Sequence, residues 1–322
     1  MKKIHAASKK NRKKITVVLM TYGSPKTLDE VPQYLKNVYG GKDPDPENVK
    51  EFQRRYHVIG GSPLIKITQK QAAALQKELN KRKTGPIFRV VAGMRFSHPF
   101  IEEVVLDSAK STDIVVGIIM SPQYSPIIMK GYLKELGEAV EKVQRKDIIL
   151  KIATDWHLEP HFLKALAKRI KEALKKLPKN ARETTPILFS AHSMPKRVID
   201  KEPGYIKDLQ ETAAKVAKLV GLPKKRWMFC YQSAGHTPEE WLKPDFADIM
   251  PILAKNRQTH VIIAPVQFLA DHLEILYDVN IGAREQAEEH GIVFSSTKSL
   301  NIEPLFIKGL AQVVRTTLKK KK

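Results

Sequence analysis

A histidine stands directly after an apolar run in the second half of the sequence. The run covers residues 186–189, and His192 follows it within the segment SAHS. A neutral imidazole can accept a proton near neutral pH or bind a borderline divalent metal. A turn histidine that only bonds its local backbone is the alternative. Because His192 falls at the carboxyl end of a predicted strand, where α/β proteins bind ligands, we favour a functional role.

Three carboxylates fall close together after a later apolar run. Asp271, Glu274 and Asp278 follow residues 261–266. In a helix, positions i, i+3 and i+7 share one face, so these groups repel one another unless water or a cation lies between them. An ordinary solvated acidic face is the alternative, although the neighbouring residues are apolar and indicate partial burial. A protected carboxylate can have a raised pKa and accept a proton near neutrality.

The two halves of the sequence resemble each other around a third candidate, Tyr22. VVLMTYGSP (17–25) is similar to ILFSAHSMP (187–195), since each has an apolar stretch, a polar ring and a proline three positions later. Tyr22 and His192 therefore occupy equivalent points just past a predicted strand. On opposite walls of one cleft, the phenol could stack on an aromatic ligand or bind a metal through its oxygen. Packing within a turn is the alternative.

Several motifs that carry chemistry in other proteins are absent. The sequence has no phosphate-binding P-loop, no G-x-G-x-x-G after a strand, no H-E-x-x-H and no G-x-S-x-G. This argues against nucleotide-driven chemistry, dinucleotide redox chemistry and serine hydrolysis. Cys230 is the only cysteine, so a disulfide framework and a four-thiolate iron–sulfur cluster are excluded.

Eight short apolar runs alternate with longer segments of helical periodicity. The runs are rich in Val and Ile, as expected for strands that are buried on both faces of a parallel sheet. The expected strands are 15–20, 88–92, 114–120, 148–153, 186–189, 227–231, 261–266 and 292–294. With the internal repeat, this alternation predicts an α/β protein of two Rossmann-like domains. Each would be a four-stranded parallel sheet flanked by helices, with a cleft between the two.

The charge of the chain is strongly positive and unevenly distributed. The 322 residues include 56 Lys and Arg against 34 Asp and Glu, a net charge of +22. We expect disordered basic tails at residues 1–14 and 319–322. The body of the chain is still basic and should attract anions such as carboxylates. We expect domains at 15–150 and 151–299, and a helix at 300–318 that packs back on the first domain.

Between the first two predicted strands, the first half carries additional sequence. KDPDP (42–46) and GGSP (60–63) are turn chemistry within this insertion. The insertion is either a surface excursion or a wall of the cleft, because long connections are often functional.

The sequence favours a cytoplasmic protein. Its longest apolar runs hold about six residues, whereas a membrane-spanning helix needs ~20. The basic start is not followed by a signal-peptide pattern of sufficient length. No RNP, zinc-finger or helix-turn-helix pattern supports stable binding of nucleic acid.

Four separated blocks of the sequence resemble the ferrochelatase family. They are IGGSPL (59–64), SAHSMP (190–195), YQSAGHTPEEWLKP (231–244) and PVQFLADHLEILYD (265–278), and the likeness extends over residues 15–318. The resemblance implies a chelatase-like fold and a lyase of haem biosynthesis that inserts Fe(II) into a porphyrin. It also implies no nucleotide, no iron–sulfur cluster and no cofactor beyond the substrate Fe(II). An iron donor or a haem-acceptor protein would be a natural partner.

The resemblance implies roles for individual residues. By position, His192 and Glu274 match the His and Glu on the metal and proton side of the macrocycle. Tyr22 matches the tyrosine of the Gram-positive enzymes, which resembles an axial contact to iron from the opposite face. Those enzymes act on coproporphyrin III and yield coproheme.

The substrate's propionates have their own expected contacts. Arg55, Tyr56 and Ser62 align with positions that bind these groups in the Gram-positive enzymes, and the four carboxylates of coproporphyrin agree with a basic cleft. However, Tyr39 stands where an arginine would help, and residues 122–125 resemble the protoporphyrin-using enzymes.

Further alternatives remain. Asn280 and Gly282 are neutral where the family often has another carboxylate near the metal, which affects an outer metal site. Protoporphyrin IX is the alternative substrate, and a cobalt or nickel chelatase of another tetrapyrrole would keep the fold. A two-lobed solute-binding protein is the alternative from another class, although a passive binder has no need of a paired His and carboxylate.

Overall fold

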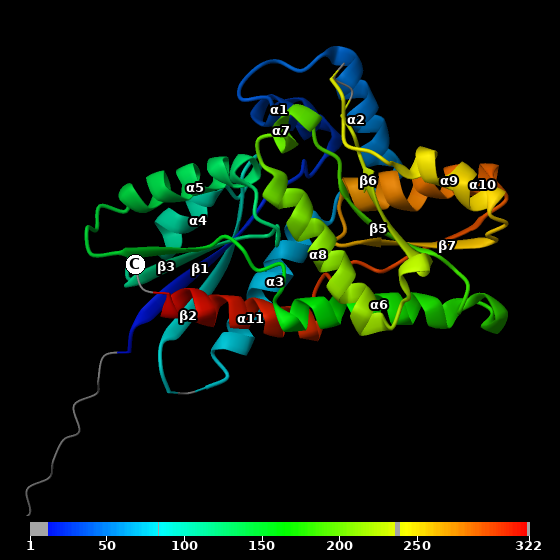
Figure 1. The fold of residues 1–322 in the computed structure, drawn as a ribbon. Coiled ribbons are helices and arrows are strands. Elements are labelled where there is room, and N and C mark those ends of the chain that lie inside the picture. Colours follow the sequence, from blue (N-terminus) through cyan, green and yellow to red (C-terminus); the bar gives the residue numbers. More distant parts are fainter. Residues whose placement is uncertain (1–11, 83, 236–238, 321–322) are drawn as a thin grey trace, which may run out of the picture.

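Two separate four-stranded parallel sheets organise the molecule (Figure 1). The computed structural model describes residues 12–82, 84–235 and 239–320. The strands are β1 (Lys14–Thr21), β2 (Ile87–Met94), β3 (Ile114–Ile119), β4 (Ile149–Ala153), β5 (Ile187–His192), β6 (Trp227–Gln232), β7 (His260–Pro265) and β8 (Val293–Ser296). Their orders, β2-β1-β3-β4 and β6-β5-β7-β8, repeat one topology. The predicted fold of two Rossmann-like domains is confirmed.

Helices cover both faces of each sheet. They are α1 (Val31–Val38), α2 (Pro46–Val58), α3 (Leu64–Leu79), α4 (Ile101–Ser108), α5 (Pro126–Glu141), α6 (Pro160–Lys176), α7 (Lys196–Ile199), α8 (Pro203–Val220), α9 (Phe246–Lys255), α10 (Arg284–Glu289), α11 (Pro304–Lys319) and the π-helix η4 (Glu274–Ala283). Short 3-10 turns are η1 (Leu28–Glu30), η2 (Lys179–Ala181) and η3 (Lys224–Arg226). Figure 1 shows α1 and α2 above the junction of the two sheets.

Alternate residues of each strand enter different cores. In β1, Val17 and Leu19 join a buried cluster with residues of α3 and α11, whereas Val18 and Met20 join another with α4 and α5. Side chains on a strand alternate between its two faces, which is why one apolar run supplies both cores. The cluster of Val17 also includes residues of α6, α8 and β5, so one continuous apolar layer connects the two halves.

Two helices cross between the halves. After β4 the chain enters α6, which contacts α8 and β7 of the second half, and after β8 it enters α11, which contacts α3, β3 and β4 of the first. The two helices also contact each other. Buried Glu303 joins them, because its carboxylate lies 2.7 Å from Lys168 Nζ and 3.2 Å from Arg169 Nη2 of α6. β4 belongs to the first sheet, which therefore extends past residue 150.

The described ends of the chain are bound to the first domain. Lys14 begins β1, and Arg12 Nε donates to the carbonyl of Gly85 at 2.6 Å. Lys151 of β4 donates to the carbonyl of Leu318 at 3.2 Å. The expected tails at 1–14 and 319–322 thus fall largely on residues outside the described ranges, and their described parts contact the fold. No helix of the described part is long and apolar enough to cross a membrane.

The contact between α6 and α11 depends on a glycine. A Cβ added at Gly309 of α11 would lie 2.5 Å from Glu159 Oε2 and 3.2 Å from the backbone nitrogen of Phe162. That carboxylate accepts from Phe162 N–H at 2.7 Å and caps the start of α6. We predict that Gly309→Ala lowers the free energy of unfolding by about 1–3 kcal/mol, because the added methyl overpacks the junction.

Gly137→Ala is the matched control for urea-induced unfolding. Gly137 also lies inside a helix, α5, but a Cβ added there meets no atom within 4 Å. The control should be more stable than the parent protein by about 0.5–1 kcal/mol, since Ala favours helix over Gly. Equal effects of the two substitutions would contradict the packing described for α11.

Candidate active site

A cavity of about 480 Å³ lies where the carboxyl ends of the two sheets meet. It is lined by residues 20–22 at the end of β1, 119–121 at β3, 192–195 at β5 and 267–270 at β7. The pairs β1–β3 and β5–β7 are the points at which strand order reverses in the two sheets. Open α/β sheets bind ligands in the crevice beside such points. Here two crevices share one cavity, whose volume is in the range of small-molecule sites.

The insertion between β1 and β2 forms another wall of the cavity. Tyr34 and Tyr39 of the α1 region, Tyr56 of α2 and Ser62 before α3 all line it. Tyr34 and Tyr56 also pack in one buried cluster with Leu273, which immediately precedes η4 in the second half. The insertion was expected to be either a surface excursion or a wall of the cleft, and the structure shows that it is a wall.

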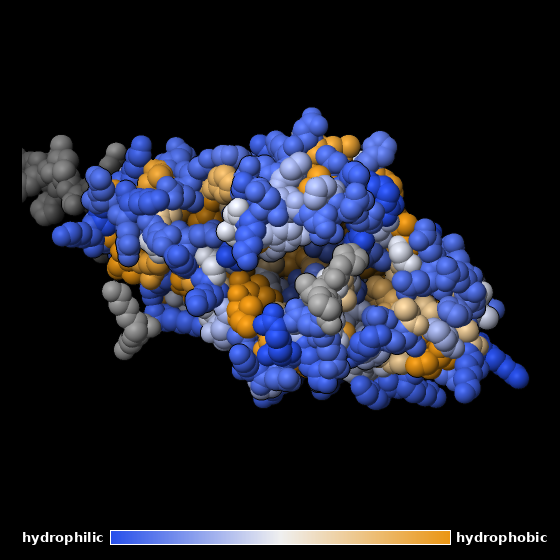
Figure 2. All heavy atoms as spheres, turned by 90° about the horizontal axis from the view of Figure 1, so that it is seen from above, coloured by the Kyte–Doolittle hydropathy of each residue, from blue (hydrophilic) through white to orange (hydrophobic). Residues whose placement is uncertain are grey.

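The wall of the cavity is apolar and aromatic. Among the described residues that line it there is no Lys or Arg, and its ionisable side chains other than tyrosine are His192, His272 and Glu274. Figure 2 shows a hollow in which hydrophobic residues gather, surrounded by hydrophilic ones. The expectation of a basic cleft is wrong for the wall itself, because total charge does not fix where the charges lie.

The backbone fixes the orientation of His192. Its N–H donates to Gln267 Oε1 at 2.9 Å, which ties the end of β5 to the segment after β7. Its Nδ1 lies against the carbonyl oxygen of Ser193. A carbonyl can only accept, so Nδ1 carries the proton and Nε2 of the neutral ring keeps its lone pair. The His192 side chain lines the cavity, where this lone pair can accept a proton or bind a metal.

Glu274 forms a pair with His272. Its Oε2 lies 3.1 Å from His272 Nε2, and His272 Nδ1 lies 2.8 Å from the carbonyl oxygen of Ala270. Nδ1 must donate to that carbonyl, which leaves Nε2 as the ring atom that faces the carboxylate. Both side chains line the same cavity as His192. The pair can therefore hold or release a proton at the cavity wall.

The acidic segment adopts a different helix from the predicted one. Asp271 lies outside the helix, where its backbone N–H and one carboxylate oxygen bond to the side chain of Asn301 at 3.0 and 2.8 Å. Glu274 and Asp278 lie on η4, a π-helix, a rare form that is frequent at functional sites. The prediction that Asp271 shares a face with Glu274 and Asp278 is therefore wrong.

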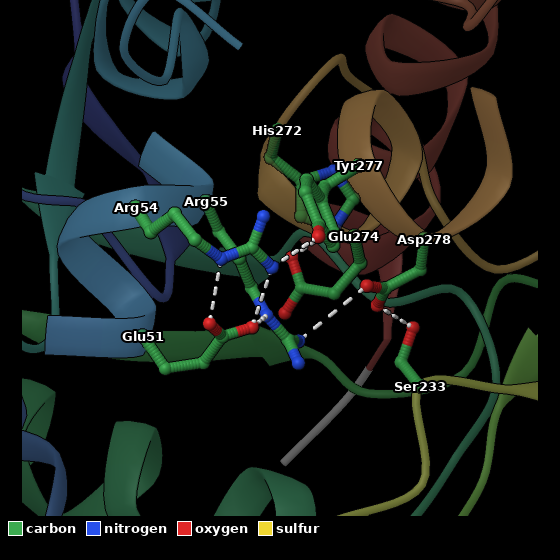
Figure 3. Close-up of polar contacts among 8 residues, drawn as sticks. All are labelled: Glu51, Arg54, Arg55, Ser233, His272, Glu274, Tyr277 and Asp278. Carbon is green, nitrogen blue, oxygen red and sulfur yellow. Dashed lines mark hydrogen bonds and ion pairs between the residues drawn. The ribbon is translucent and has the colours of Figure 1, made fainter. Parts of the chain in front are cut away.

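Asp278 is the more buried of the two acids on η4. It accepts a hydrogen bond from Ser233, and its Oδ1 lies 3.7 Å from Arg55 Nη1 (Figure 3). Burial is the largest cause that raises the pKa of Asp278, and Glu274 raises it further, while Ser233 and Arg55 oppose the rise. The segment thus keeps two neighbouring carboxyl groups in different environments.

Two arginines of α2 reach toward η4 (Figure 3). Arg54 donates to the hydroxyl of Tyr277, and Arg55 Nε lies 2.7 Å from Glu51. Arg54 and Arg55 together hold the pKa of Glu51 down at about 2, through their hydrogen bonds to its carboxylate. Arg55 is engaged by protein carboxylates and does not line the cavity, so it stands beside the cavity rather than within it.

Tyr22 faces the cavity from the first sheet. Its ring packs edge-on against Phe96 with centroids 4.5 Å apart, and 45% of its surface is still exposed. The surrounding protein nevertheless removes water from the hydroxyl and, with the nearby Glu274, raises the pKa of Tyr22 to about 12, against the opposing charge of Arg95. The phenol is neutral in the physiological range.

Tyr56 and Ser62 also reach the cavity wall. Tyr56 is buried, and burial is the main cause that raises its pKa. Ser62 Oγ accepts from Leu64 N–H at 3.4 Å, beside the start of α3. Of the six residues predicted for the site, the structure places five on the cavity wall and Arg55 outside it.

Sequence reasoning missed His272 and Phe268 as site residues. The rings of Phe268 and His272 lie 4.6 Å apart, and Phe268 also contacts His192 edge-on at 6.4 Å. Phe268 therefore lies between the two imidazoles that face the cavity. A signal for His272 was present, since it is two residues from Glu274 in the sequence.

Solved structures with the same fold are chelatases. SirB from Bacillus subtilis with Fe3+ has a TM-score of 0.60 and 11% identity, over 95% of this chain and 96% of that chain. CbiX, the terminal enzyme for siroheme biosynthesis in denitrifying bacteria, has a TM-score of 0.55 and 13% identity, over 96% and 100%. At these identities the likeness shows the fold, which is the chelatase fold.

Relatives with higher sequence identity indicate the family more specifically than the solved structures do. The ferrochelatase from Herpetosiphon aurantiacus is 38% identical over 303 residues, which cover 94% of this chain and 98% of the relative. The coproporphyrin III ferrochelatase from Geobacillus kaustophilus is 35% identical over 309 residues, 94% and 96% of the two chains. The ferrochelatase family profile matches residues 14–318.

The chain belongs to the ferrochelatase family, whose enzymes insert a metal into a porphyrin. It is therefore an enzyme of haem biosynthesis, and the alternative of a two-lobed solute-binding protein is wrong.

The raised pKa of Tyr22 gives a direct spectroscopic prediction. In alkaline titrations followed by phenolate absorbance, wild type and Tyr22→Phe should coincide below about pH 10 and diverge only above it, because the phenol ionises near pH 12. Glu274→Gln removes a neighbouring negative charge and should lower the pKa of Tyr22. A phenolate that titrates below pH 10 and is missing in Tyr22→Phe would contradict this electrostatic account.

Proposed function

We propose that this ferrochelatase inserts Fe(II) into coproporphyrin III to give coproheme, without any cofactor beyond the substrate iron. The observation that carries the proposal is that Tyr22 and His192, at equivalent strand ends of two repeated sheets, line one aromatic cavity. A flat tetrapyrrole would lie between these two rings, in contact with the aromatic wall.

Metallation needs proton acceptors and a deformed substrate. Two pyrrole N–H bonds break and release two protons, Fe(II) sheds water, and the four nitrogens bind the metal with no change of oxidation state. Distortion of a bound substrate can take about 1–5 kcal/mol from remote contacts. The protein must therefore supply a base near the ring nitrogens and firm contacts around the periphery.

His192 is suited to the metal and proton side. Its Nδ1 is bonded to the Ser193 carbonyl, so the lone pair of the neutral ring is on Nε2, and the side chain lines the cavity. In the proposal, His192 accepts a pyrrole proton or passes Fe(II) to the ring nitrogens. Nε2 has one lone pair, so it can bind either a proton or the metal at a given time, but not both.

Glu274 supports this step as the partner carboxylate. It lies 3.1 Å from His272 Nε2, and His272 is itself anchored to the Ala270 carbonyl. In the proposal, a proton accepted by either group can pass between them while the ring of His272 stays in place. Asp278, one helical turn further on, has a raised pKa through burial and offers a next acceptor in line.

Tyr22 acts from the opposite face in the proposal. With its pKa raised to about 12, the free side chain presents a neutral phenol that can stack beneath the macrocycle. Its oxygen would be the group on that side that could contact the substrate iron. The edge-on contact with Phe96 holds the ring in place.

The propionates of a bound porphyrin would have to extend beyond the apolar cavity to contact an arginine. Within the described residues the cavity wall has no Lys or Arg, and its hydrogen-bonding groups include Tyr56 and Ser62. Arg54 and Arg55 lie beside it on α2, bound to Glu51. A propionate could replace one of the contacts of Arg55, because an arginine fork binds any carboxylate.

Two porphyrins are candidates for the substrate. Relatives named coproporphyrin III ferrochelatase match at 32–35% identity, among them those of Geobacillus kaustophilus and Listeria innocua, and they support coproporphyrin III. Protoporphyrin IX has two propionates rather than four, and the lack of Lys and Arg among the described residues of the cavity wall favours it. We propose coproporphyrin III as the substrate and protoporphyrin IX as the second candidate.

The first prediction concerns His192 and Glu274. His192→Ala and Glu274→Gln should each lower kcat for iron insertion by at least about 100-fold, the usual range for loss of an acid–base group. Porphyrin affinity, measured from the Soret shift, should change less than threefold. Near-normal kcat in both variants with intact porphyrin binding would defeat the assignment.

The second prediction concerns substrate choice. Wild type should have a higher kcat/KM for coproporphyrin III than for protoporphyrin IX in parallel assays. Arg55→Gln should raise KM for coproporphyrin III more than for protoporphyrin IX, because it removes a charged contact for a propionate.

Arg89→Gln is the control for that comparison. Arg89 pairs with Asp107 at 2.5 Å on the surface of the first domain and does not line the cavity. It should leave both KM values unchanged. A higher kcat/KM for protoporphyrin IX in wild type would reject the proposed substrate but leave the family assignment intact.

A further inference from the structure

A second cluster of metal-ligating side chains lies outside the active-site cavity. Asp155 and His157 stand between β4 and α6, where the chain passes from the first sheet to the second half, and Asp208 and Glu211 lie on α8. None of the four lines the cavity described above. The α6 and α8 helices contact each other, so this crossing segment and α8 are neighbours (Figure 1).

His157 is held in one tautomer. Asp155 Oδ1 lies 2.6 Å from its Nδ1, so Nδ1 donates and Nε2 of the neutral ring carries the lone pair. The side chain is only 7% exposed. Among residues 12–82, 84–235 and 239–320, Nε2 has no hydrogen-bond partner. A buried ring nitrogen without a partner is uncommon and calls for an explanation.

The unpartnered nitrogen points toward two carboxylates. Nε2 lies 3.7 Å from Asp208 Oδ1 and 3.6 Å from Glu211 Oε2. These separations are too long for hydrogen bonds. They are close to the spacing of about 3.4 Å between two ligands of one tetrahedral ion with metal–ligand bonds of about 2.1 Å.

The surroundings of the cluster prepare it for a cation. Tyr124 N–H donates to Asp208 Oδ2 at 3.2 Å, which leaves Oδ1 directed at His157. Asp155 orients the imidazole from behind, as carboxylates do for metal-binding histidines in many proteins. Three carboxylates, those of Asp155, Asp208 and Glu211, surround this single imidazole.

We propose that these residues form a binding site for a divalent transition-metal ion, distinct from the iron-insertion site. His157 Nε2, Asp208 and Glu211 supply the ligands, Asp155 positions the imidazole, and water completes the coordination. One imidazole with carboxylates suits Zn2+ and chemically similar ions. The bound ion would tie the crossing segment to α8, which also carries Tyr205 at the cavity wall.

Zn2+ binding to tag-free full-length protein tests the proposal. His192→Ala/Glu274→Gln serves as the parent protein, because it lacks the two metal ligands proposed on the His192 side of the cavity. Competition with a chromogenic zinc chelator should show one Zn2+ per parent chain. Adding His157→Gln should weaken that binding at least 100-fold, and Glu211→Gln, at a half-exposed position that leaves the fold intact, at least tenfold.

His161→Gln in the same parent is the matched control. His161 lies at the start of α6, pairs with Glu159 at 2.9 Å and is 42% exposed, so its loss should leave Zn2+ affinity unchanged. Zn2+ should also raise the melting temperature of the parent protein but not of the His157→Gln variant. A parent that binds no Zn2+, or a His157→Gln variant that binds Zn2+ as tightly as its parent, would overturn the proposal. Neither result bears on porphyrin metallation.

Discussion

Everything in the candidate site depends on how the two sheets are held together. Parallel strands place their carboxyl ends at one edge of a sheet, so each half alone would present a single crevice beside its switch point. The exchange of α6 and α11 between the halves, with one apolar layer and the buried Glu303 between them, brings two such crevices to one cavity. Tyr22 and His192 face the same space because their strands are equivalent and their sheets are fixed in this arrangement.

The second half adds reactive groups through an unusual helix. In η4, the π-helical winding carries Glu274 and Asp278 while Asp271 is left outside and bound to Asn301. His272 is anchored just before the helix by the Ala270 carbonyl, which leaves its other nitrogen to Glu274. Through Arg54 and Arg55, the insertion of the first half contacts the same helix. The acid–base groups therefore belong to a segment that is braced from both halves.

The sequence was a good guide to the strands and to the residues that follow them. Buried parallel strands are continuous apolar runs, and all the predicted runs became strands within a few residues of their expected bounds. The repeat around Tyr22 and His192 could be recognised in the sequence because equivalent strands end in equivalent turns. The family resemblance was carried by four blocks of sequence, and the family match confirms it.

Other features could not be predicted, for physical reasons. The acidic segment was considered as one helix, but Asp271 is bound to Asn301, which is distant in sequence, and lies outside the π-helix. The apolar wall contradicts a basic cleft because net charge says nothing about position. Arg55 also pairs with Asp278, which is more than 200 residues away in the sequence, and this contact could not be predicted. His157 and Asp208 are likewise brought together only by the packing of α6 against α8.

The most direct test of the account is a crystal structure of the protein bound to a metal-free porphyrin. The account predicts that the macrocycle lies in the cavity between the ring of Tyr22 and the imidazole of His192, with Glu274 on the imidazole side. A porphyrin bound elsewhere, or one that contacts only one of these two rings, would contradict it.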